Sequence, residues 1–458
     1  MTLFTFFNNT LSIGTQRFLS YSIGKSDMKK LSDVFSTTFH LHVLFSLGFL
    51  IIAEIGGMWF LNHMLKIPEG RYEAAFWVYQ FSVIASTASI VQVPFHSAII
   101  SHEKMNIYAY VSMYDAVMKL LIVYLIQVMS QDKLILYAFF VLLVQLSTVL
   151  IYITYCGSHY SESHYLRKFD RGVFKEIASF SGWSIFGCAA VAFQGQGVNM
   201  LLNMFFGTIV NAARGIAFQV NSVILQFVSN FQTAVNPQII KLYASNKKDE
   251  LIELVTSSSQ ISAYLLILIS IPCFIEIEYI LNIWLGDYPD YTPIFLRITI
   301  IQSLIQTMTR PLVTTIHAVG KMKAVNLSSG IVLLLILPCS YFLLRNGASP
   351  VTVFWVNVIP WIIHLFLELF WLKKYIDFPF YHYIKKVHGK VLPMTIVLFF
   401  IPYTIRNLTP YDDWMGLIVT FLSSTVASII VIGYFGLSRK IRQRLISSCF
   451  QRISKFKG

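Results

Sequence analysis

Basic side chains lie inside or at the margins of long apolar stretches of this sequence, at Arg17, Lys119, Arg214, Arg297 and Arg310. A charge at the centre of a bilayer costs at least about 2.5–3.5 kcal/mol on insertion scales, so such a residue normally faces a polar cavity or a partner. A guanidinium can also bind a phosphate through two parallel hydrogen bonds. We therefore interpret these residues as candidate anion ligands, although Arg17, Arg214 and Arg297 stand near segment ends, where snorkelling is an alternative explanation.

Lys119 and Arg310 lie deeper in their segments, and both are expected to line a cavity. Lys119 follows Asp115 by one helical turn on the same face, so the two side chains can pair. Arg310 has no acidic residue within a turn. Arg310 is therefore the principal candidate for direct contact with an anionic ligand.

A polar stretch, AFQGQGVNM (192–200), interrupts another apolar segment and contains Gln194, Gln196 and Asn199 between small residues. We expect it to line a cavity or to form a gating bend, and helix packing through Gly195 and Gly197 is the alternative. Separate acidic candidates are Glu54 and Asp115, which could pair with a base or bind a coupling Na⁺ or H⁺. No other cofactor and no metal site is expected, since neither the scattered cysteines nor the histidines have metal-ligand spacing.

The composition predicts the environment in which these residues work. The chain is 56% hydrophobic and only 12% charged, with a mean hydropathy of +0.64, which excludes a soluble globule. A helix needs about 20 residues to cross a membrane. Runs of that length predict twelve helical spans, at 37–61, 75–100, 107–130, 133–156, 176–204, 208–236, 252–277, 292–318, 324–345, 350–372, 391–406 and 414–437.

The basic residues between these spans are distributed unevenly. Alternate loops and the tail on one side hold 25 Lys and Arg, whereas the opposite loops hold five. The positive-inside rule places the richer side and the C-terminus in the cytoplasm. The basic segment 438–458 is expected to be a cytoplasmic tail, either solvated or lying on anionic lipids. The net charge of +13 thus reflects orientation, and no nucleic-acid partner is expected.

Two pairs of segments suggest an internal duplication. Pro94, Ile99, Lys104 and Met105 each recur 217 positions later, at Pro311, Ile316, Lys321 and Met322. Residues 15–27 and 237–249 share four identities at an offset of 222. Because both copies carry lysines on the cytoplasmic side, the halves are expected to have the same orientation, related by an axis along the membrane normal.

Several strings in order resemble one family: TQRFLSYSIGKSD, AAFWVYQFSV, VQVPFHSAIISHEKMNIYAYVS, FKEIASFSGWSIFG, NAARGIAFQVN, NFQTAVNPQIIKLYA and EYILNIWLG. Over residues 1 to about 437 the chain resembles Wzx-type polysaccharide flippases of Bacteroides-like bacteria, in the multidrug/oligosaccharidyl-lipid/polysaccharide (MOP) exporter superfamily. The resemblance implies an all-α polytopic protein of fourteen helices. Expected parts are an N-terminal lobe (1–160), a C-terminal lobe (161–374), an added helix pair (375–437) and the tail. Relative to the family, the first helix is expected to be missing and the second, 1–23, partial.

The resemblance implies a flippase that moves a polyprenyl-pyrophosphate-linked oligosaccharide across the bacterial inner membrane by alternating access, for capsule or O-antigen biosynthesis. Expected partners are this lipid-linked cargo, membrane lipids and glycan polymerase machinery. The alternative is a MATE-like drug or cation exporter of the same superfamily, whose cargo would favour carboxylates and aromatic rings. An enzyme is not expected, because the external loops are too short to carry an active site.

Overall fold

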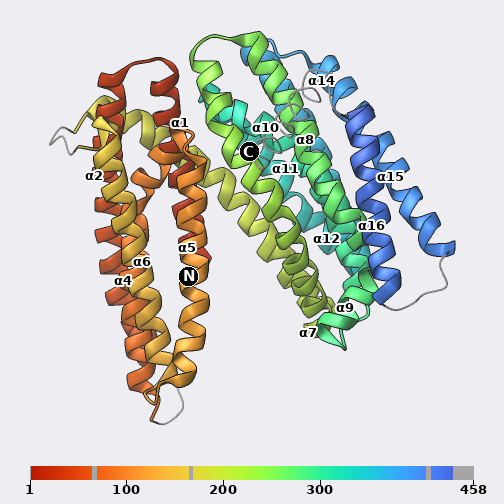
Figure 1. Ribbon diagram of the computed structural model, residues 1–458, viewed down its shortest axis with the longest axis horizontal. Coiled ribbons are helices and arrows are strands. Elements are labelled where there is room, and N and C mark those ends of the chain that lie inside the picture. The colour runs from red at the N-terminus through yellow and green to blue at the C-terminus, as the bar shows by residue number, and fades with distance from the viewer. Residues whose placement is uncertain (1, 64–69, 165–168, 409–413, 437–458) are drawn as a thin grey trace, which may run out of the picture. The chain divides into compact units, whose positions relative to one another are not determined.

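The computed structural model describes residues 2–63, 70–164, 169–408 and 414–436. Within these ranges every regular element is a helix, and there is no strand (Figure 1). This confirms an all-α polytopic membrane protein. The basic tail 438–458, Cys449, Lys66, Arg167 and Lys168 lie outside the described residues.

The chain divides into two compact units, and the first contains Met1–Cys188 with Ile240–Lys247. Its elements are α1 (Thr2–Gly24), α2 (Met28–Ile52), the π-helical turn η1 (Ala53–Gly57), α3 (Met58–His63), α4 (Tyr72–Ser101), α5 (Met105–Val128), α6 (Lys133–His159), the 3₁₀ turn η2 (Ser161–Ser163) and both ends of α7 (Arg171–Ala244). At about 1.5 Å per residue, the 23 residues of α1 extend about 34 Å. The segment therefore has the length of a membrane span, and its being partial relative to the family stays a prediction.

The second unit contains Ala189–Ile239 and Lys248–Gly458. After the middle of α7 it comprises α8 (Lys248–Ile275), α9 (Ile277–Leu285), α10 (Thr292–Val319), α11 (Met322–Leu334), α12 (Ile336–Arg345), α13 (Pro350–Ile376), α14 (Phe380–Lys386), α15 (His388–Leu408), α16 (Trp414–Val431) and the π-helical turn η3 (Ile432–Gly436). Its apolar core lies among α7, α8, α10 and α13, where the rings of Phe295 and Phe354 stack 3.9 Å apart.

All twelve expected spans coincide with helices. Two of them fall in the 74-residue α7, which is interrupted at Gly207 by a backbone with φ of 79° and ψ of −167°. This break lies in the short loop expected at 205–207. Among the described residues, ten segments have the length and composition of a membrane span, with α7 counted once and with α1 and α10 not included. The frequent Thr, Ser and Gln of α10 make it less apolar than the others.

Acidic residues begin several helices. Asp27 accepts a hydrogen bond from the backbone N–H of Lys30 at the start of α2. Asp132 and Asp170 each accept two such bonds, at the starts of α6 and α7. A carboxylate at this position satisfies backbone N–H groups that have no partner inside the helix and favours the positive end of the helix dipole.

The turns after α4 and α10 confirm the repeat at an offset of 217. Glu103 and Gly320 both adopt a left-handed backbone, with φ of 59° and 83°. The next residues, Lys104 and Lys321, have nearly identical dihedral angles of −82°, 61° and −86°, 66°. The two copies thus share a backbone path as well as a sequence pattern.

The other repeat pair needs a correction. Ser26 and Asn246 are the left-handed residues of their turns, with φ of 55° and 56°, which sets the structural offset at 220 and not at 222. The two segments pack against each other within the first unit, where the rings of Tyr21 and Tyr243 lie 6.4 Å apart. A Cβ on Gly24 would lie only 2.7 Å from the Cα of Lys241, so glycine permits this close approach.

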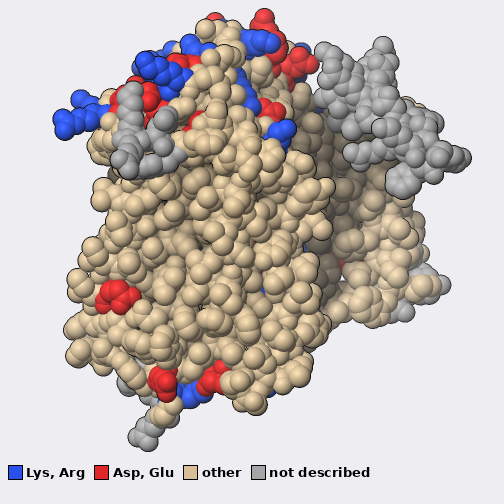
Figure 2. All heavy atoms as spheres, turned by 60° about the vertical axis from the view of Figure 1, so that its left-hand side comes forward, with Lys and Arg blue, Asp and Glu red and all other residues tan. Residues whose placement is uncertain are grey.

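The charged side chains of the face shown in Figure 2 follow the expected pattern. Lys and Arg gather at one end, and a broad band with little charge separates them from the opposite end. A small acidic patch interrupts this band. The uncharged band is the surface expected to contact hydrocarbon, since charges concentrate outside the bilayer core.

Candidate functional site

The break in α7 brings its polar residues together. The Gly207 turn folds the helix back, so that Asn199 and Arg214 face each other within the second unit. The Arg214 guanidinium donates one hydrogen bond of 3.0 Å to Oδ1 of Asn199 and one of 3.0 Å to the carbonyl of Gly195. Its carbon lies 4.5 Å from the centre of the Phe218 ring. Three sequence-predicted positions therefore form one cluster around a half-buried cation.

The other polar residues of the stretch 192–200 have different surroundings. Gln194 is buried and donates a 2.9 Å hydrogen bond to Oδ1 of Asn357 on α13, which is also buried. Gln196 is exposed. Sequence reasoning missed Asn357, although a single amide in the apolar run WVNVIPW was a usable signal.

The two glycines of this stretch have separate roles. A Cβ on Gly197 would lie 2.5 Å from Leu337 of α12, so this glycine serves helix packing, as the alternative explanation held. A Cβ on Gly195 would meet nothing within 4 Å. Gly195 instead contributes its carbonyl oxygen to Arg214.

Arg297 forms an ion pair near the α8–α9 junction. Two of its nitrogens lie 2.8 Å from the two carboxylate oxygens of Glu278, and its Nε donates to the Phe274 carbonyl at 3.3 Å. Close by, the Nε of Arg406 and the hydroxyl of Thr420 each donate a 2.6 Å hydrogen bond to the same oxygen of Glu276. Both arginines thus join helices at one end of the second unit.

Lys119 and Asp115 pair along α5, as their spacing predicted. The Nζ of Lys119 donates to Oδ2 of Asp115 at 2.7 Å, and the side chains are 47% and 32% exposed. Because the pair is neutral overall, either residue is less costly in an apolar environment than it would be alone.

Arg17 is surrounded by aromatic rings in the first unit. Its guanidinium carbon lies 4.4, 5.2 and 5.4 Å from the ring centres of Phe18, Tyr21 and Phe180. Such contacts stabilise a cation through the ring quadrupole. Arg17 thus has an aromatic surround like that of Arg214, which lies beside Phe218.

Arg310 is exposed on α10 and lies within electrostatic range of His364 on α13. The Nε2 of His364 is 3.2 Å from Oε1 of Glu368, one turn later, and both side chains are buried. This buried pair was not predicted from the sequence. Its signal was a His and a Glu four residues apart in the apolar run HLFLE.

Glu54 stands in the π-helical turn η1. Its Oε2 accepts a 3.2 Å hydrogen bond from the amide of Gln80, and the hydroxyl of Tyr79 donates to the neighbouring Ala53 carbonyl at 2.5 Å. π-Helical turns inside α-helices recur at functional sites. The described residues contain no group of three or more His, Cys, Asp or Glu arranged to hold a metal ion.

A further ion pair lies after α6, outside the membrane spans. The Nε2 of His102 is 2.5 Å from Oε1 of Glu162, whose side chain is 2% exposed, and the His102 ring stacks on Tyr160 at 4.1 Å. Burial by itself would raise the pKa of Glu162. The hydrogen bond and charge of His102, together with a backbone N–H, outweigh burial and lower that pKa below its ordinary value.

Comparison of the sequence with protein-family models and with curated proteins gives no match. Solved structures do match. A MATE protein in complex with MaL6 has a TM-score of 0.72 at 11% identity, over 82% of this chain and 85% of that one. The chain has the fold of MATE transporters of the MOP superfamily.

Two more members of this fold illustrate its breadth. A MOP superfamily transporter from Pyrococcus furiosus, for which a reverse polarity of the binding pocket is described, has a TM-score of 0.69 at 12% identity, over 82% and 85% of the chains. A mutant of the Vibrio cholerae MATE transporter VcmN has a TM-score of 0.70 at 12% identity, over 81% and 86%. At these identities the likeness establishes the MOP fold alone.

Proposed function

We propose that the chain is an alternating-access transporter of the inner membrane that flips a polyprenyl-pyrophosphate-linked oligosaccharide. The observation that carries this proposal is the environment of Arg214. Its hydrogen-bond acceptors are an amide oxygen and a backbone carbonyl, both neutral. The guanidinium is thereby held in place while its positive charge remains uncompensated by a carboxylate among the described residues.

An uncompensated, half-buried guanidinium favours an anionic ligand. Coulomb attraction strengthens as water is excluded, and a phosphate can accept parallel hydrogen bonds from the free N–H groups. The other polar side chains near this part of α7, Gln194 and Asn357, are neutral amides, which suit sugar hydroxyls as well as phosphate oxygens. A pyrophosphate joined to a glycan presents both kinds of group.

The remaining candidates extend the same proposal. Arg310 would provide further positive charge in the second unit, and Arg17 would do so in the first. Lys119, as the cation of a neutral pair with Asp115, would offer hydrogen-bond donors to the cargo. Glu54 or Asp115 would bind the coupling Na⁺ or H⁺. Glycan polymerase machinery would then receive the translocated oligosaccharide on the outer side of the membrane.

A MATE-like exporter of drugs or organic cations is the second candidate, and the structural neighbours favour it. Such a cargo would be attracted by carboxylates, of which Glu54 and Glu368 lie in membrane-spanning helices. Glu54 accepts a hydrogen bond from neutral Gln80. The two candidates therefore differ in the charge of the ligand that the protein should bind.

Ligand binding to the purified full chain separates these candidates. The probes are a polyprenyl pyrophosphate and tetraphenylphosphonium, each titrated against tryptophan fluorescence. The proposal expects pyrophosphate binding that weakens about tenfold or more in Arg214→Gln. Arg345→Gln, which removes an exposed arginine at the end of α12, is the matched control and should bind normally.

Binding of tetraphenylphosphonium without binding of the pyrophosphate would overturn the flippase proposal and support the exporter. A cellular test is complementation of a strain that lacks its own flippase. Wild type and Arg345→Gln should restore polysaccharide export, and Arg214→Gln should fail at equal membrane abundance.

A further inference from the structure

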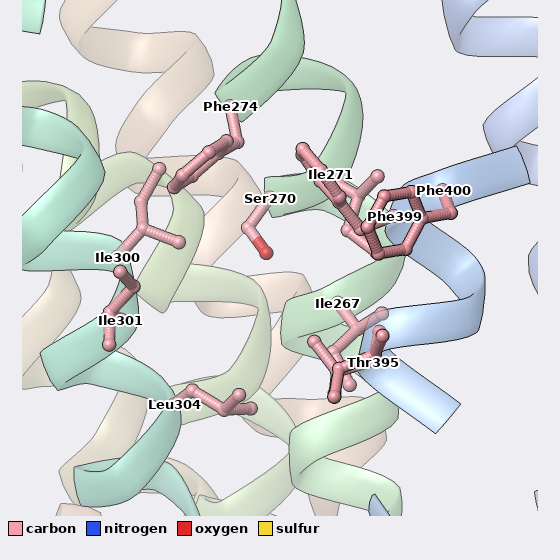
Figure 3. A pocket seen from close by; sticks show the side chains of 11 residues that line it. Ile267, Ser270, Ile271, Phe274, Ile300, Ile301, Leu304, Thr395, Phe399 and Phe400 are labelled. Atoms are coloured by element: carbon pink, nitrogen blue, oxygen red, sulfur yellow. The ribbon is translucent and has the colours of Figure 1, made fainter. Parts of the chain in front are cut away.

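An apolar groove lies in the second unit between α8, α10 and α15, away from the polar residues of α7. Its volume is about 330 Å³. Figure 3 shows the side chains of Ile271, Phe274, Ile301, Leu304 and Phe399 arranged around it from these three helices. Apart from the hydroxyls of Ser270 and Thr395, the lining consists of aliphatic and aromatic groups.

A second, polar pocket of about 520 Å³ lies near the ends of two of the same helices. Its lining includes Glu276, Glu278, Tyr403, Arg406 and Asn407. The predicted orientation assigns this end of the second unit to the outer side of the membrane. Tyrosine and charged residues are typical of the region where lipid headgroups meet hydrocarbon.

The two pockets follow one another along a single seam between α8 and α15. On α8 the apolar groove uses residues 267–274, and the polar pocket begins at Ile275. On α15 the groove uses residues 395–400, and the polar pocket uses Tyr403 onward. Both helices are expected to run from the cytoplasm outward, so the order is the same on each side of the seam.

Aromatic rings mark the boundary between the pockets. Phe274 of α8 meets Phe399 of α15 edge to face at 5.7 Å, and Phe399 stacks on Tyr403 at 5.4 Å. The groove is therefore bounded at its outer end by rings, and the polar pocket starts beyond them. The apolar groove thus suits the acyl chain of a phospholipid, and the polar pocket suits its headgroup.

The charges of the polar pocket favour a zwitterionic headgroup. Glu276 is paired with Arg406, and Glu278 is paired with Arg297. Arg297 does not line the pocket, but it neutralises Glu278, which does. The charges of these four residues therefore sum to zero, and no excess positive charge attracts an anionic lipid. Paired carboxylates and guanidiniums instead offer an acceptor for an amine and a donor for a phosphate at the same place.

We propose that this seam binds a phospholipid with a zwitterionic, amine-bearing headgroup, such as phosphatidylethanolamine, with one acyl chain in the groove. The groove by itself gives little selectivity, because lipid tails are as apolar as the side chains that line it. Preference among lipids must therefore come from the headgroup pocket. The proposal is independent of the cargo, since none of its residues belongs to the Arg214 cluster.

Native mass spectrometry of the full chain, released from detergent after exposure to equal amounts of phosphatidylethanolamine and phosphatidylglycerol, tests the groove. Wild type should retain phosphatidylethanolamine preferentially. Ile301→Trp, which adds bulk from the open side of the groove, should retain at least fivefold less. Ile331→Trp makes the same change at an exposed position of α11 outside the groove and should behave as wild type.

The headgroup pocket is tested by Glu278→Gln. This change leaves Arg297 without its carboxylate and makes the pocket net positive, so the ratio of retained phosphatidylethanolamine to phosphatidylglycerol should fall at least fivefold. Glu253→Gln, near the other end of α8, is the control and should leave the ratio unchanged. Equal retention in Ile301→Trp, an unchanged ratio in Glu278→Gln, or retention of a polyprenyl lipid in place of phospholipid would each overturn the proposal.

Discussion

Arg214 and Asn199 are joined by a hydrogen bond of 3.0 Å across the Gly207 break of α7. The amide oxygen positions the guanidinium and leaves its charge intact. Asparagine and aspartate have nearly the same shape. Replacing the amide nitrogen of residue 199 by an oxygen would therefore change the net charge of this site from positive to neutral.

Asn199→Asp should therefore weaken anion binding without harming the fold. The new carboxylate would pair with Arg214 and neutralise it, and loss of a charged hydrogen bond to the ligand costs about 1.5–3 kcal/mol, which is roughly 10- to 100-fold in affinity. Titration with polyprenyl pyrophosphate measures this effect. Asn203→Asp adds the same charge at an exposed position of α7 and should bind normally. Normal binding by Asn199→Asp would contradict the assignment of Arg214 as the anion ligand.

The backbone of Gly207 yields a prediction about stability. Its φ of 79° and ψ of −167° belong to a region that essentially only glycine occupies, so Gly207→Ala should cost about 1–3 kcal/mol. Thermal unfolding in detergent provides the measurement. Gly215→Ala lies in the same helix, where a Cβ meets nothing within 4 Å and φ is not positive, and should be neutral or slightly stabilising. Equal melting temperatures for the two variants would show that α7 tolerates a side chain at its break.

The ion pair between Glu162 and His102 should make the free energy of unfolding depend on pH. Burial opposes ionisation, but His102 lowers the folded-state pKa below the unfolded value of about 4.3, so ionised Glu162 stabilises the fold. This contribution is present above the unfolded pKa and is lost as pH falls through the folded pKa. Glu162→Gln should thus lower stability by about 1–3 kcal/mol at pH 7.

Thermal unfolding between pH 7 and pH 3 checks this prediction for Glu162. The difference from wild type should shrink toward the acidic end of the range. Glu73→Gln, at an exposed position in the first turn of α4, should differ little from wild type across the same range. A difference for Glu162→Gln that grows as the pH falls would have the wrong sign and would refute the pairing.

Orientation is predicted by the distribution of basic residues. In a cysteine-free background, single cysteines at 25, 104, 171, 247, 321 and 386 should escape an impermeant thiol reagent in intact cells, whereas position 348 should react. Labelling after permeabilisation controls for exposure of the six sites. Reaction at two or more of them in intact cells would refute both the orientation and the parallel relation of the halves.

The helices could be predicted because hydrophobic length is a local property. The break at Gly207 and the pair formed by Asp115 and Lys119 were also accessible, since both depend on residues close in sequence. The hydrogen bond between Gln194 and Asn357 spans 163 positions, and the burial of His364 and Glu368 depends on neighbouring helices. Both contacts depend on how each helix is rotated about its own axis. Apolar periodicity carries little information on this rotation, because the lipid-facing and core-facing sides of a membrane helix are both apolar.

The ion pair of Arg297 also could not be predicted, because it depends on contacts between helices. Its partner, Glu278, is 19 residues away on a helix that only the fold brings near. From the sequence, Arg297 could be placed near a segment end but could not be paired with a residue of another helix. Charged residues at segment ends are therefore ambiguous from sequence. Arg214 and Asn199 were each selected as candidates, but the hydrogen bond between them was not predicted.

The left-handed turn at Glu103 bears on how the two copies of the repeat diverged. A side chain in this conformation costs about 1–2 kcal/mol relative to glycine, which the second copy has at 320. Glu103 nevertheless accepts a 2.6 Å hydrogen bond from Lys241, a contact that glycine could not make. The two copies thus keep the same left-handed turn, but only in the first copy does the turn residue cross-link two helices through its side chain. The copies have therefore become different in their contacts without a change in the path of the backbone.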